Sequence, residues 1–186
     1  MTKSVELVKK VCLIGDPGVG KTSLIRRYVL DQFDDAYLST IGAKVTKKTK
    51  LVDVPENDLK LTMNLMIWDV AGQKEYLQFH EMYLKGMEGV ISVCDVTRKN
   101  TVESLKGSIT MVNKHAGEVP IVFLLNKCDL VDPASINLKD IELVAVPRGI
   151  PILPTSAKNG LNVEEAFERL CNMIARRWIN YKLSKM

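Results

Sequence analysis

One eight-residue stretch near the N-terminus constrains the fold of this chain more than any other. Residues 15–22 read GDPGVGKT and match the pattern G-x-x-x-x-G-K-[ST] at every fixed position. The apolar run 11–14 precedes the stretch, and a helix-like run, 23–30, follows it. A glycine loop between a strand and a helix turns successive backbone N–H groups, and the positive end of the helix, toward an anion. The sequence therefore predicts a phosphate-binding loop made of Gly15, Asp16, Pro17, Gly18, Val19, Gly20, Lys21, Thr22 and Ser23.

Two side chains of this loop carry chemistry of their own. Lys21 is placed to reach the β- and γ-phosphates of a nucleotide, and the hydroxyl of Thr22 is placed to hold Mg²⁺. A glycine turn that matches the pattern by chance is the alternative. The strand-like and helix-like flanks of the loop argue against that alternative, because they supply the structural context that the mechanism needs.

Size and composition indicate one domain that buries a core. The chain has 186 residues, of which 46% are apolar and 26% are charged, the ordinary balance of a globular protein. No apolar run approaches the roughly 18 residues of a membrane span, and the N-terminus has no signal-peptide pattern. The four cysteines form no C-x-x-C pair, which favours buried thiols in a reducing compartment. Without a membrane span or a signal-peptide pattern, we expect a cytoplasmic protein. The net charge of +4 is mild, and we expect no nucleic-acid partner.

Strand-like and helix-like runs alternate along the chain in the order of a doubly wound α/β sheet. The polar loop 53–58 between the second and third strands is too short for a crossover helix, so these two strands are expected to form a hairpin. We therefore expect a six-stranded, mostly parallel sheet with one antiparallel edge strand and helices on both faces. The expected strands are residues 8–14, 44–52, 59–70, 89–95, 121–126 and 152–155.

Capping patterns indicate where two helices begin. Asn100 with Glu103, and Asn162 with Glu165, have the spacing of capping boxes. They predict one helix from about residue 100 to residue 116 and a last helix that begins near residue 162. Apolar residues recur at helical spacing in the last helix, which predicts one face packed on the sheet.

The ends of three further strands carry residues that suit a guanine nucleotide. Asp69 ends a strand, where its carboxylate can hold Mg²⁺ through water, and Gly72 lets the backbone approach a γ-phosphate. Asp129 can accept hydrogen bonds from the N1–H and N2–H₂ groups of guanine, a donor pair that adenine lacks. The backbone N–H of Ala157 can donate to the guanine O6. A base that left these buried groups unpaired would cost several kcal/mol, so the pattern predicts selectivity for guanine.

Taken together, these motifs resemble those of the Ras-superfamily small GTPases, and most closely those of the Rab branch. The resemblance covers roughly residues 8–178 and implies a P-loop NTPase G domain, here a single domain over residues 1–186. The similarity to Rab proteins depends on Tyr37-Leu-Ser-Thr-Ile-Gly42 and on Ile67-Trp-Asp69. The motifs that match, in order, are residues 15–22, Thr40, residues 69–73, 126–129 and 156–158.

The resemblance implies a role for each matching residue and names GTP or GDP and Mg²⁺ as cofactors. Gln73 would orient the attacking water and, with Lys21 and Thr40, would form the catalytic group. Thr22, Thr40 and Asp69 would hold Mg²⁺. Phe33 would lie across the guanine, and Tyr37 would close over the phosphates. Beyond residues 15–23, the implied nucleotide contacts are Phe33, Tyr37, Thr40, Gly72, Asn126, Lys127, Asp129, Ser156, Ala157 and Lys158.

The implied function is a monomeric GTP-hydrolysing switch, in which the γ-phosphate orders segments around Thr40 (switch I) and Gly72–Gln73 (switch II). An exchange factor, an activating protein and effectors would act through these switches and the strands between them. No arginine lies between Tyr28 and Arg98, so an arginine finger is expected from a partner, and intrinsic hydrolysis is expected to be slow. No cysteine follows Cys171, so on the chain as given we expect no prenyl anchor and at most weak membrane association.

Two other functions stay open from the sequence. Pro17 stands where related proteins more often have Gly or Ser, and its ring would crowd the space shared by Gln73 and an incoming arginine. A nucleotide-locked scaffold with impaired hydrolysis is therefore the first alternative. An ATP-dependent enzyme built on the same loop is the second, and Asp129 and Ala157 argue against it.

Overall fold

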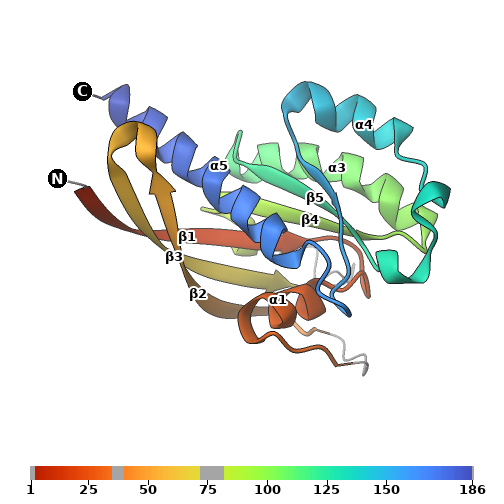
Figure 1. Ribbon diagram of the computed structural model, residues 1–186. Helices are drawn as coiled ribbons and strands as arrows, with labels where there is room; N and C mark the ends of the chain where they lie inside the picture. Colours follow the sequence, from red (N-terminus) through yellow and green to blue (C-terminus); the bar gives the residue numbers. More distant parts are fainter. Residues whose placement is uncertain (1–2, 35–39, 72–81, 186) are drawn as a thin grey trace.

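The expected mixed sheet with one antiparallel edge strand is confirmed. The computed structural model describes residues 3–34, 40–71 and 82–185. Six strands form one sheet in the order β2-β3-β1-β4-β5-β6, in which only β2 runs antiparallel to its neighbour (Figure 1). The strands are β1 (Lys3–Ile14), β2 (Ala43–Val54), β3 (Leu59–Val70), β4 (Gly89–Asp95), β5 (Ile121–Asn126) and β6 (Ile152–Pro154).

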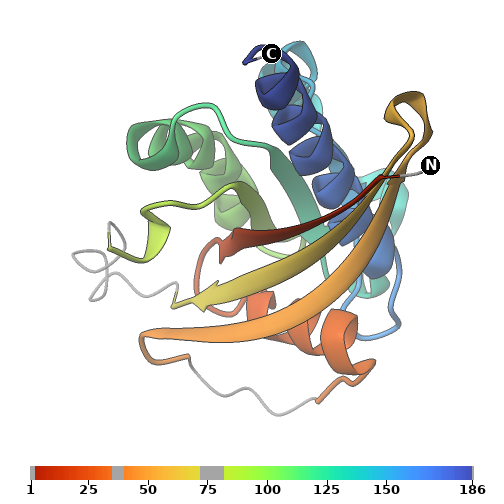
Figure 2. The same ribbon diagram turned by 90° about the vertical axis from the view of Figure 1, so that its left-hand side faces the viewer.

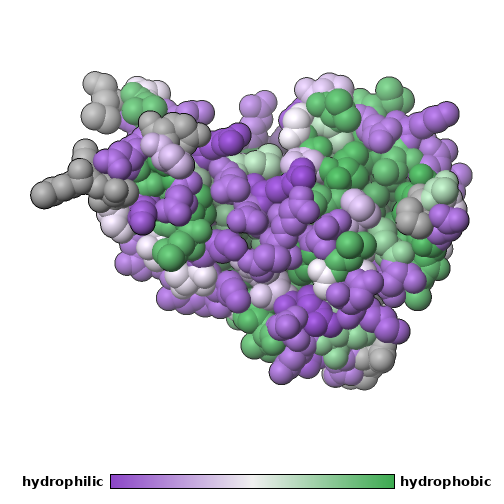
Figure 3. Space-filling model, in the orientation of Figure 1, coloured by the Kyte–Doolittle hydropathy of each residue, from purple (hydrophilic) through white to green (hydrophobic). Residues whose placement is uncertain are grey.

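Helices cover both faces of the sheet, as the alternating pattern predicts. Figure 2 shows α1 and α5 on one side of the sheet and α3 on the other. Side chains of α1 and α5 form one buried core with β1, β2 and β3, and side chains of α3 and α4 form a second core on the opposite face. Figure 3 shows mainly hydrophilic side chains over the outer surface of α5, as an amphipathic helix requires. The helices among the described residues are α1 (Lys21–Leu30), α3 (Lys99–Ala116), α4 (Lys139–Ala145) and α5 (Val163–Leu183), with short 3₁₀ turns η1 (Pro55–Asn57), η3 (Cys128–Leu130), η4 (Pro133–Ser135) and η5 (Val146–Arg148).

The parallel register brings the carboxyl ends of the strands to one edge. β1 pairs with β3 as far as Leu13 opposite Asp69, and β4 pairs with β5 as far as Asp95 opposite Asn126. The loop after β1 leaves the sheet between β3 and β4, because β1 lies between these two strands. Residues that are far apart in the sequence therefore meet where the phosphate loop begins, which is where ligands bind in open α/β sheets.

Four strand boundaries differ from the prediction, two of them by a single residue (the start of β2 and the end of β6), and neither predicted capping box forms. β1 begins at Lys3 rather than residue 8, and the hairpin strand β2 extends to Val54 rather than residue 52; charged residues interrupt the apolar pattern at both ends. Neither Asn100 nor Asn162 caps its helix through its side chain. The hydroxyl of Thr101 instead forms hydrogen bonds with the backbone of the turn before α3.

The backbone N–H of Asp95 donates to the Thr101 hydroxyl, 2.9 Å away, which closes the turn between β4 and α3. Asn162 has a left-handed backbone, with a φ of 52°, and its side-chain amide donates to the carbonyl of Pro154 at 2.8 Å. Both capping boxes were wrong in their hydrogen bonds: Thr101 forms the contacts at the start of α3, and the Asn162 side chain contacts Pro154 rather than the first turn of α5.

The predicted burial of the thiols is confirmed. Three cysteines, which we call the core cysteines, are almost fully buried, and Cys128 is slightly more exposed. Burial raises the pKa of each core cysteine to about 12. No helix in the described part of the chain is long and apolar enough to cross a membrane. The core cysteines are Cys12, Cys94 and Cys171.

Candidate nucleotide-binding site

The phosphate loop needs glycine at two of its positions for steric reasons. Gly15 and Gly20 have φ values of 140° and 100°, which side chains rarely allow. A Cβ atom on Gly15 would lie 2.2 Å from the carbonyl oxygen of Val93, and one on Gly20 would lie 2.3 Å from the amide nitrogen of Asn126. The backbone therefore packs directly against β4 and the end of β5. This close packing leaves the curled loop no room for larger residues.

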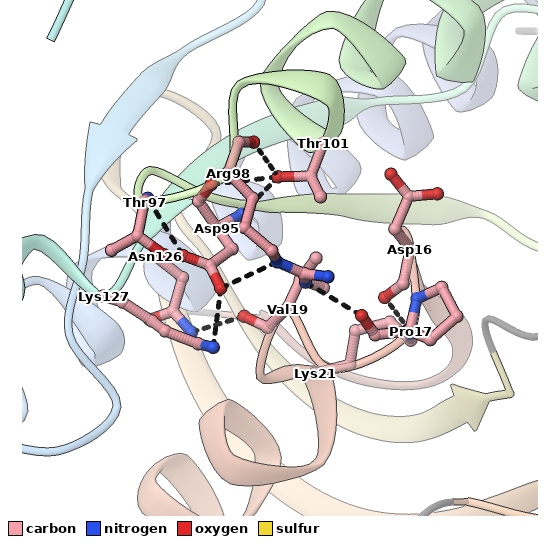
Figure 4. Close-up of polar contacts among 10 residues, drawn as sticks. All are labelled: Asp16, Pro17, Val19, Lys21, Asp95, Thr97, Arg98, Thr101, Asn126 and Lys127. Carbon is pink, nitrogen blue, oxygen red and sulfur yellow. Dashed lines mark hydrogen bonds and ion pairs between the residues drawn. The ribbon is translucent and has the colours of Figure 1, made fainter.

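Lys21 lies across the inside of the loop. Its ammonium group donates to the carbonyls of Gly15 and Asp16, at 2.7 and 3.0 Å (Figure 4). Burial lowers the pKa of Lys21 to about 8, against the opposing charges of Asp69 and Asp16 and with a further lowering by Arg98. A buried cation held only by carbonyls is suited to binding an anion, because a phosphate would neutralise it.

Three oxygen atoms from distant segments converge beside the loop. The Thr22 hydroxyl donates to Oδ2 of Asp69 at 2.5 Å and lies 3.0 Å from the hydroxyl oxygen of Thr40. The other carboxylate oxygen, Oδ1 of Asp69, is buried and has no hydrogen-bond partner among the described residues. Burial also raises the pKa of this carboxyl, against the hydrogen bonds from Thr22.

This oxygen group fits Mg²⁺. Hard divalent cations take oxygen ligands, and Mg²⁺ is usually held by one or two carboxylates together with phosphate and water. A cation would also stabilise the ionised form of Asp69 and give its Oδ1 atom a partner. Thr22, Thr40 and Asp69, the three predicted ligands, are thus brought together by α1, the segment before β2 and the end of β3.

Asn126 joins the phosphate loop to the predicted base-binding loop. Its side-chain amide donates to the carbonyl of Val19 at 2.8 Å, and its side-chain oxygen accepts the backbone N–H of Ala157 at 3.2 Å. The Ser156 hydroxyl donates to Oδ1 of Asp129 at 2.6 Å, which orients that carboxylate. The predicted base-binding residues at the ends of β5 and β6 are therefore held together by hydrogen bonds within the protein.

Three residues that contact the predicted site were not identified from the sequence. Arg27 of α1 donates to the carbonyls of Ala157 and Lys158, at 3.0 and 2.7 Å, and so supports the base-binding loop. Asp95 and Arg98 lie beside the phosphate loop, where Arg98 contacts Pro17 (Figure 4). A signal for Asp95 was available, because it ends a strand as Asp69 does. Neither arginine has a local signal for its contact with these loops, since the loop carbonyls that Arg27 and Arg98 bind lie at least 80 positions away in the sequence.

Asp95 is a buried carboxylate beside the base-binding motif. It forms an ion pair with Lys127 at 2.6 Å and accepts hydrogen bonds from the backbone and hydroxyl of Thr97, at 3.0 and 2.6 Å. Burial alone would raise its pKa, but Lys127 and Thr97 together hold the pKa of Asp95 below its ordinary value. The carboxylate therefore stays ionised and gives Lys127 a fixed position.

The remaining predicted residues divide into two groups. Phe33 is half-buried and packs against the core around α1 and α5. Tyr37, Gly72 and Gln73 lie outside the described residues. The loop, the metal ligands and the base-binding motif are thus brought together, while the predicted roles of these four residues stay predictions.

Comparison with known proteins gives consistent results. The sequence model of the Ras family matches residues 10–176 of the chain. Human Ras-related protein Rab-31 is 38% identical over 89% of this chain and 82% of its own length. Human Ras-related protein Rab-8B is 35% identical over 99% of this chain and 86% of its own length. Arabidopsis thaliana Ras-related protein RABD2c is 36% identical over 95% of this chain and 85% of its own length.

Proposed function

Because the chain belongs to the Rab branch of the Ras superfamily of small GTPases, we propose that it is a single-domain switch that binds GTP and hydrolyses it slowly to GDP. One observation carries the proposal. Asn126 contacts both the phosphate loop and the backbone of Ala157, in the loop proposed to recognise guanine, so one side chain connects the two halves of a guanine-nucleotide site. The Ala157 N–H would have to be shared with, or released from, Asn126 to donate to guanine O6.

In-line phosphoryl transfer needs mainly positioning and charge neutralisation, and each residue of the site would supply one of these. Lys21 would leave its two carbonyl partners for the β- and γ-phosphates. Thr22, Thr40 and Asp69 would hold Mg²⁺, which supplies charge neutralisation at the phosphates. Asp129, oriented by Ser156, would accept the guanine donors. Gln73 would orient the attacking water.

Switching would follow from the presence or absence of the γ-phosphate. Thr40 would bind Mg²⁺ and the γ-phosphate only in the GTP state, and Gly72 would lose its contact after hydrolysis, so both switches would relax. An exchange factor, an activating protein and effectors would read or reset these segments. No arginine lies between Tyr28 and Arg98, so the activating protein would supply the arginine that speeds hydrolysis.

The proposed base specificity has a direct test. Asp129→Asn should shift the preference from guanine to xanthine nucleotides, because an amide can donate to the 2-oxo group of xanthine. Asp132→Asn is a matched control, since Asp132 is exposed and its carboxylate accepts the backbone N–H of Ala134, a hydrogen bond that an asparagine oxygen can keep. Competition of GDP, XDP and ADP against a labelled guanine nucleotide measures the preference. Unchanged guanine affinity in Asp129→Asn would refute this base site.

The scaffold alternative is supported by one observation, the position of Pro17. Pro17 is exposed at the start of the curled loop, where its fixed φ is compatible with a turn. We expect normal nucleotide affinity but altered hydrolysis or altered response to an activating protein. Single-turnover GTP hydrolysis of wild type and Pro17→Gly separates the two functions: retained GTP in wild type and rapid turnover in the variant would favour the scaffold.

A further inference from the structure

Arg98 contacts the phosphate loop from outside the predicted motifs. Its Nη2 donates to the carbonyl oxygen of Pro17 at 2.8 Å, and its Nε donates to Oδ2 of Asp95 at 3.1 Å (Figure 4). The two partners lie on different elements, the phosphate loop and the end of β4. A planar guanidinium group holds two acceptors in a fixed relative position, which a lysine cannot do.

Asp95 makes Arg98 part of a larger connection. The same Oδ2 atom that accepts from Arg98 also pairs with Lys127 at 2.6 Å. Asp95 is almost fully buried, whereas the Arg98 side chain is 40% exposed. A buried carboxylate orients its partners more firmly than an exposed one, because water competes less for it. Arg98 is therefore fixed at its Nε end while its Nη2 end reaches the loop.

The hydrogen bond to Pro17 acts on a donor of the phosphate site. The carbonyl of Pro17 and the N–H of Gly18 belong to one planar peptide unit, so a partner that fixes the carbonyl also fixes the direction of the N–H. Backbone N–H groups of such a loop are the donors that cradle the phosphates of a nucleotide. Proline cannot donate, so Gly18 supplies the first N–H after the turn.

We propose that Arg98 is a positioning residue of the nucleotide site: it fixes the Pro17–Gly18 peptide and thereby favours nucleotides with a β-phosphate over monophosphates. This inference rests on the proposed function, because it assigns a role within the same guanine-nucleotide site. Base recognition is not affected directly, since Lys127 keeps its pair with Asp95 when Arg98 is replaced.

The test compares Arg98→Gln with wild type and with Arg148→Gln. Arg148 is exposed and also donates to a backbone carbonyl, that of Val144 at 2.9 Å, so the control removes the same charge and the same kind of bond elsewhere. Release of labelled GDP and competition by GDP and GMP are measured for each protein. We expect GDP release to be about 10-fold faster in Arg98→Gln, as for loss of one charge-assisted hydrogen bond.

The selectivity for GDP over GMP distinguishes a positioning role of Arg98 from a general effect on the fold. Affinity for GDP should fall about 10-fold in Arg98→Gln while affinity for GMP changes less than about two-fold, whereas a loosened fold would weaken both equally. Arg98→Lys keeps the charge without the fork and should lose part of the selectivity. Equal losses for GDP and GMP, or an Arg98→Lys protein identical to wild type, would overturn the proposal.

Failure of this inference differs from failure of the proposed function. A wild-type protein that binds neither GDP nor GTP would refute the guanine-nucleotide site itself. A wild-type protein that binds GDP, together with an Arg98→Gln variant of unchanged GDP to GMP selectivity, would refute only the role of Arg98. Should Arg98→Gln not fold by circular dichroism, the selectivity of Arg98→Lys decides the question alone.

Discussion

Replacing Tyr28 by phenylalanine should stabilise the protein, which is the opposite of the usual effect of a core substitution. Tyr28 lies on α1, and its hydroxyl is buried with no hydrogen-bond partner among the described residues. Burial raises the pKa of Tyr28, and the nearby Cys171 and two glutamates of α5 raise it further, so the hydroxyl stays neutral. A buried, unpaired polar group costs about 1–3 kcal/mol.

The favourable contacts of the ring survive the substitution. The Tyr28 ring stacks on Phe167 with centroids 3.8 Å apart, and the Lys48 ammonium lies 5.3 Å from the Tyr28 ring centroid. A phenyl ring keeps both contacts. The void left by the oxygen, about 12 Å³, costs about 0.3 kcal/mol at about 24 cal/mol per Å³. The net gain is therefore about 1 kcal/mol, or a rise of about 3 °C in Tm for a chain of this size.

Urea unfolding followed by circular dichroism measures the gain, at one saturating concentration of GDP and Mg²⁺ because bound ligand adds stability. Tyr181→Phe is the matched control: Tyr181 is 58% exposed and has a lysine, Lys185, 5.4 Å from its ring centroid. The control should change stability by less than about 0.5 kcal/mol. A loss of 1 kcal/mol or more in Tyr28→Phe would refute the reasoning and indicate a bound water on the hydroxyl.

Three further predictions follow from the site and the core. In Asn126→Asp the new carboxylate cannot donate to the carbonyl of Val19, so release of a fluorescent nucleotide should be about 10- to 100-fold faster. Release at the wild-type rate would contradict the role of Asn126 in joining the phosphate loop to the predicted base-binding loop. The pKa of Lys21 is lowered from 10.5 to about 8, and a bound phosphate would favour its ammonium form. The affinity for GDP should therefore fall as the pH rises above about 8, and calorimetry in two buffers at pH 9 should detect proton uptake on binding. The core cysteines, with pKa values of about 12, should resist iodoacetamide at pH 8 until the protein unfolds, and fast labelling of the native state would show that they are accessible.

The sequence predicts most of the fold because the strongest signals are local. Buried parallel strands read as continuous apolar runs, so β4 and β5 have the bounds that were expected from the sequence. The bounds of β3 were also as expected, because apolar residues alternate with polar ones along its first half. The hairpin follows from the length of one loop. Strand β1 is the counterexample, since Glu6, Lys9 and Lys10 break its apolar pattern while its backbone pairs with β3 as far back as Lys3.

The predicted site shows the same division between local and distant information. The phosphate loop, with its lysine and threonine, is contiguous in the sequence, and its geometry follows from residue type alone. The convergence of Thr22 and Asp69 follows from the parallel register of β1 and β3. Arg27 and Arg98 could not be predicted, because an arginine on a helix surface is usually solvated and only the tertiary fold supplies its carbonyl partners.

These two arginines have a common physical role. Each reaches from a helix or helix start to backbone carbonyls of a loop, Arg27 to the base-binding loop and Arg98 to the phosphate loop. Loops expose carbonyls that no secondary structure satisfies, and a charged donor on a neighbouring element can hold them without closing the binding face. Asn126 does the same between the two loops from within the sheet. The geometry of the nucleotide site therefore depends on side chains that satisfy loop backbone, as much as on those that would contact the nucleotide.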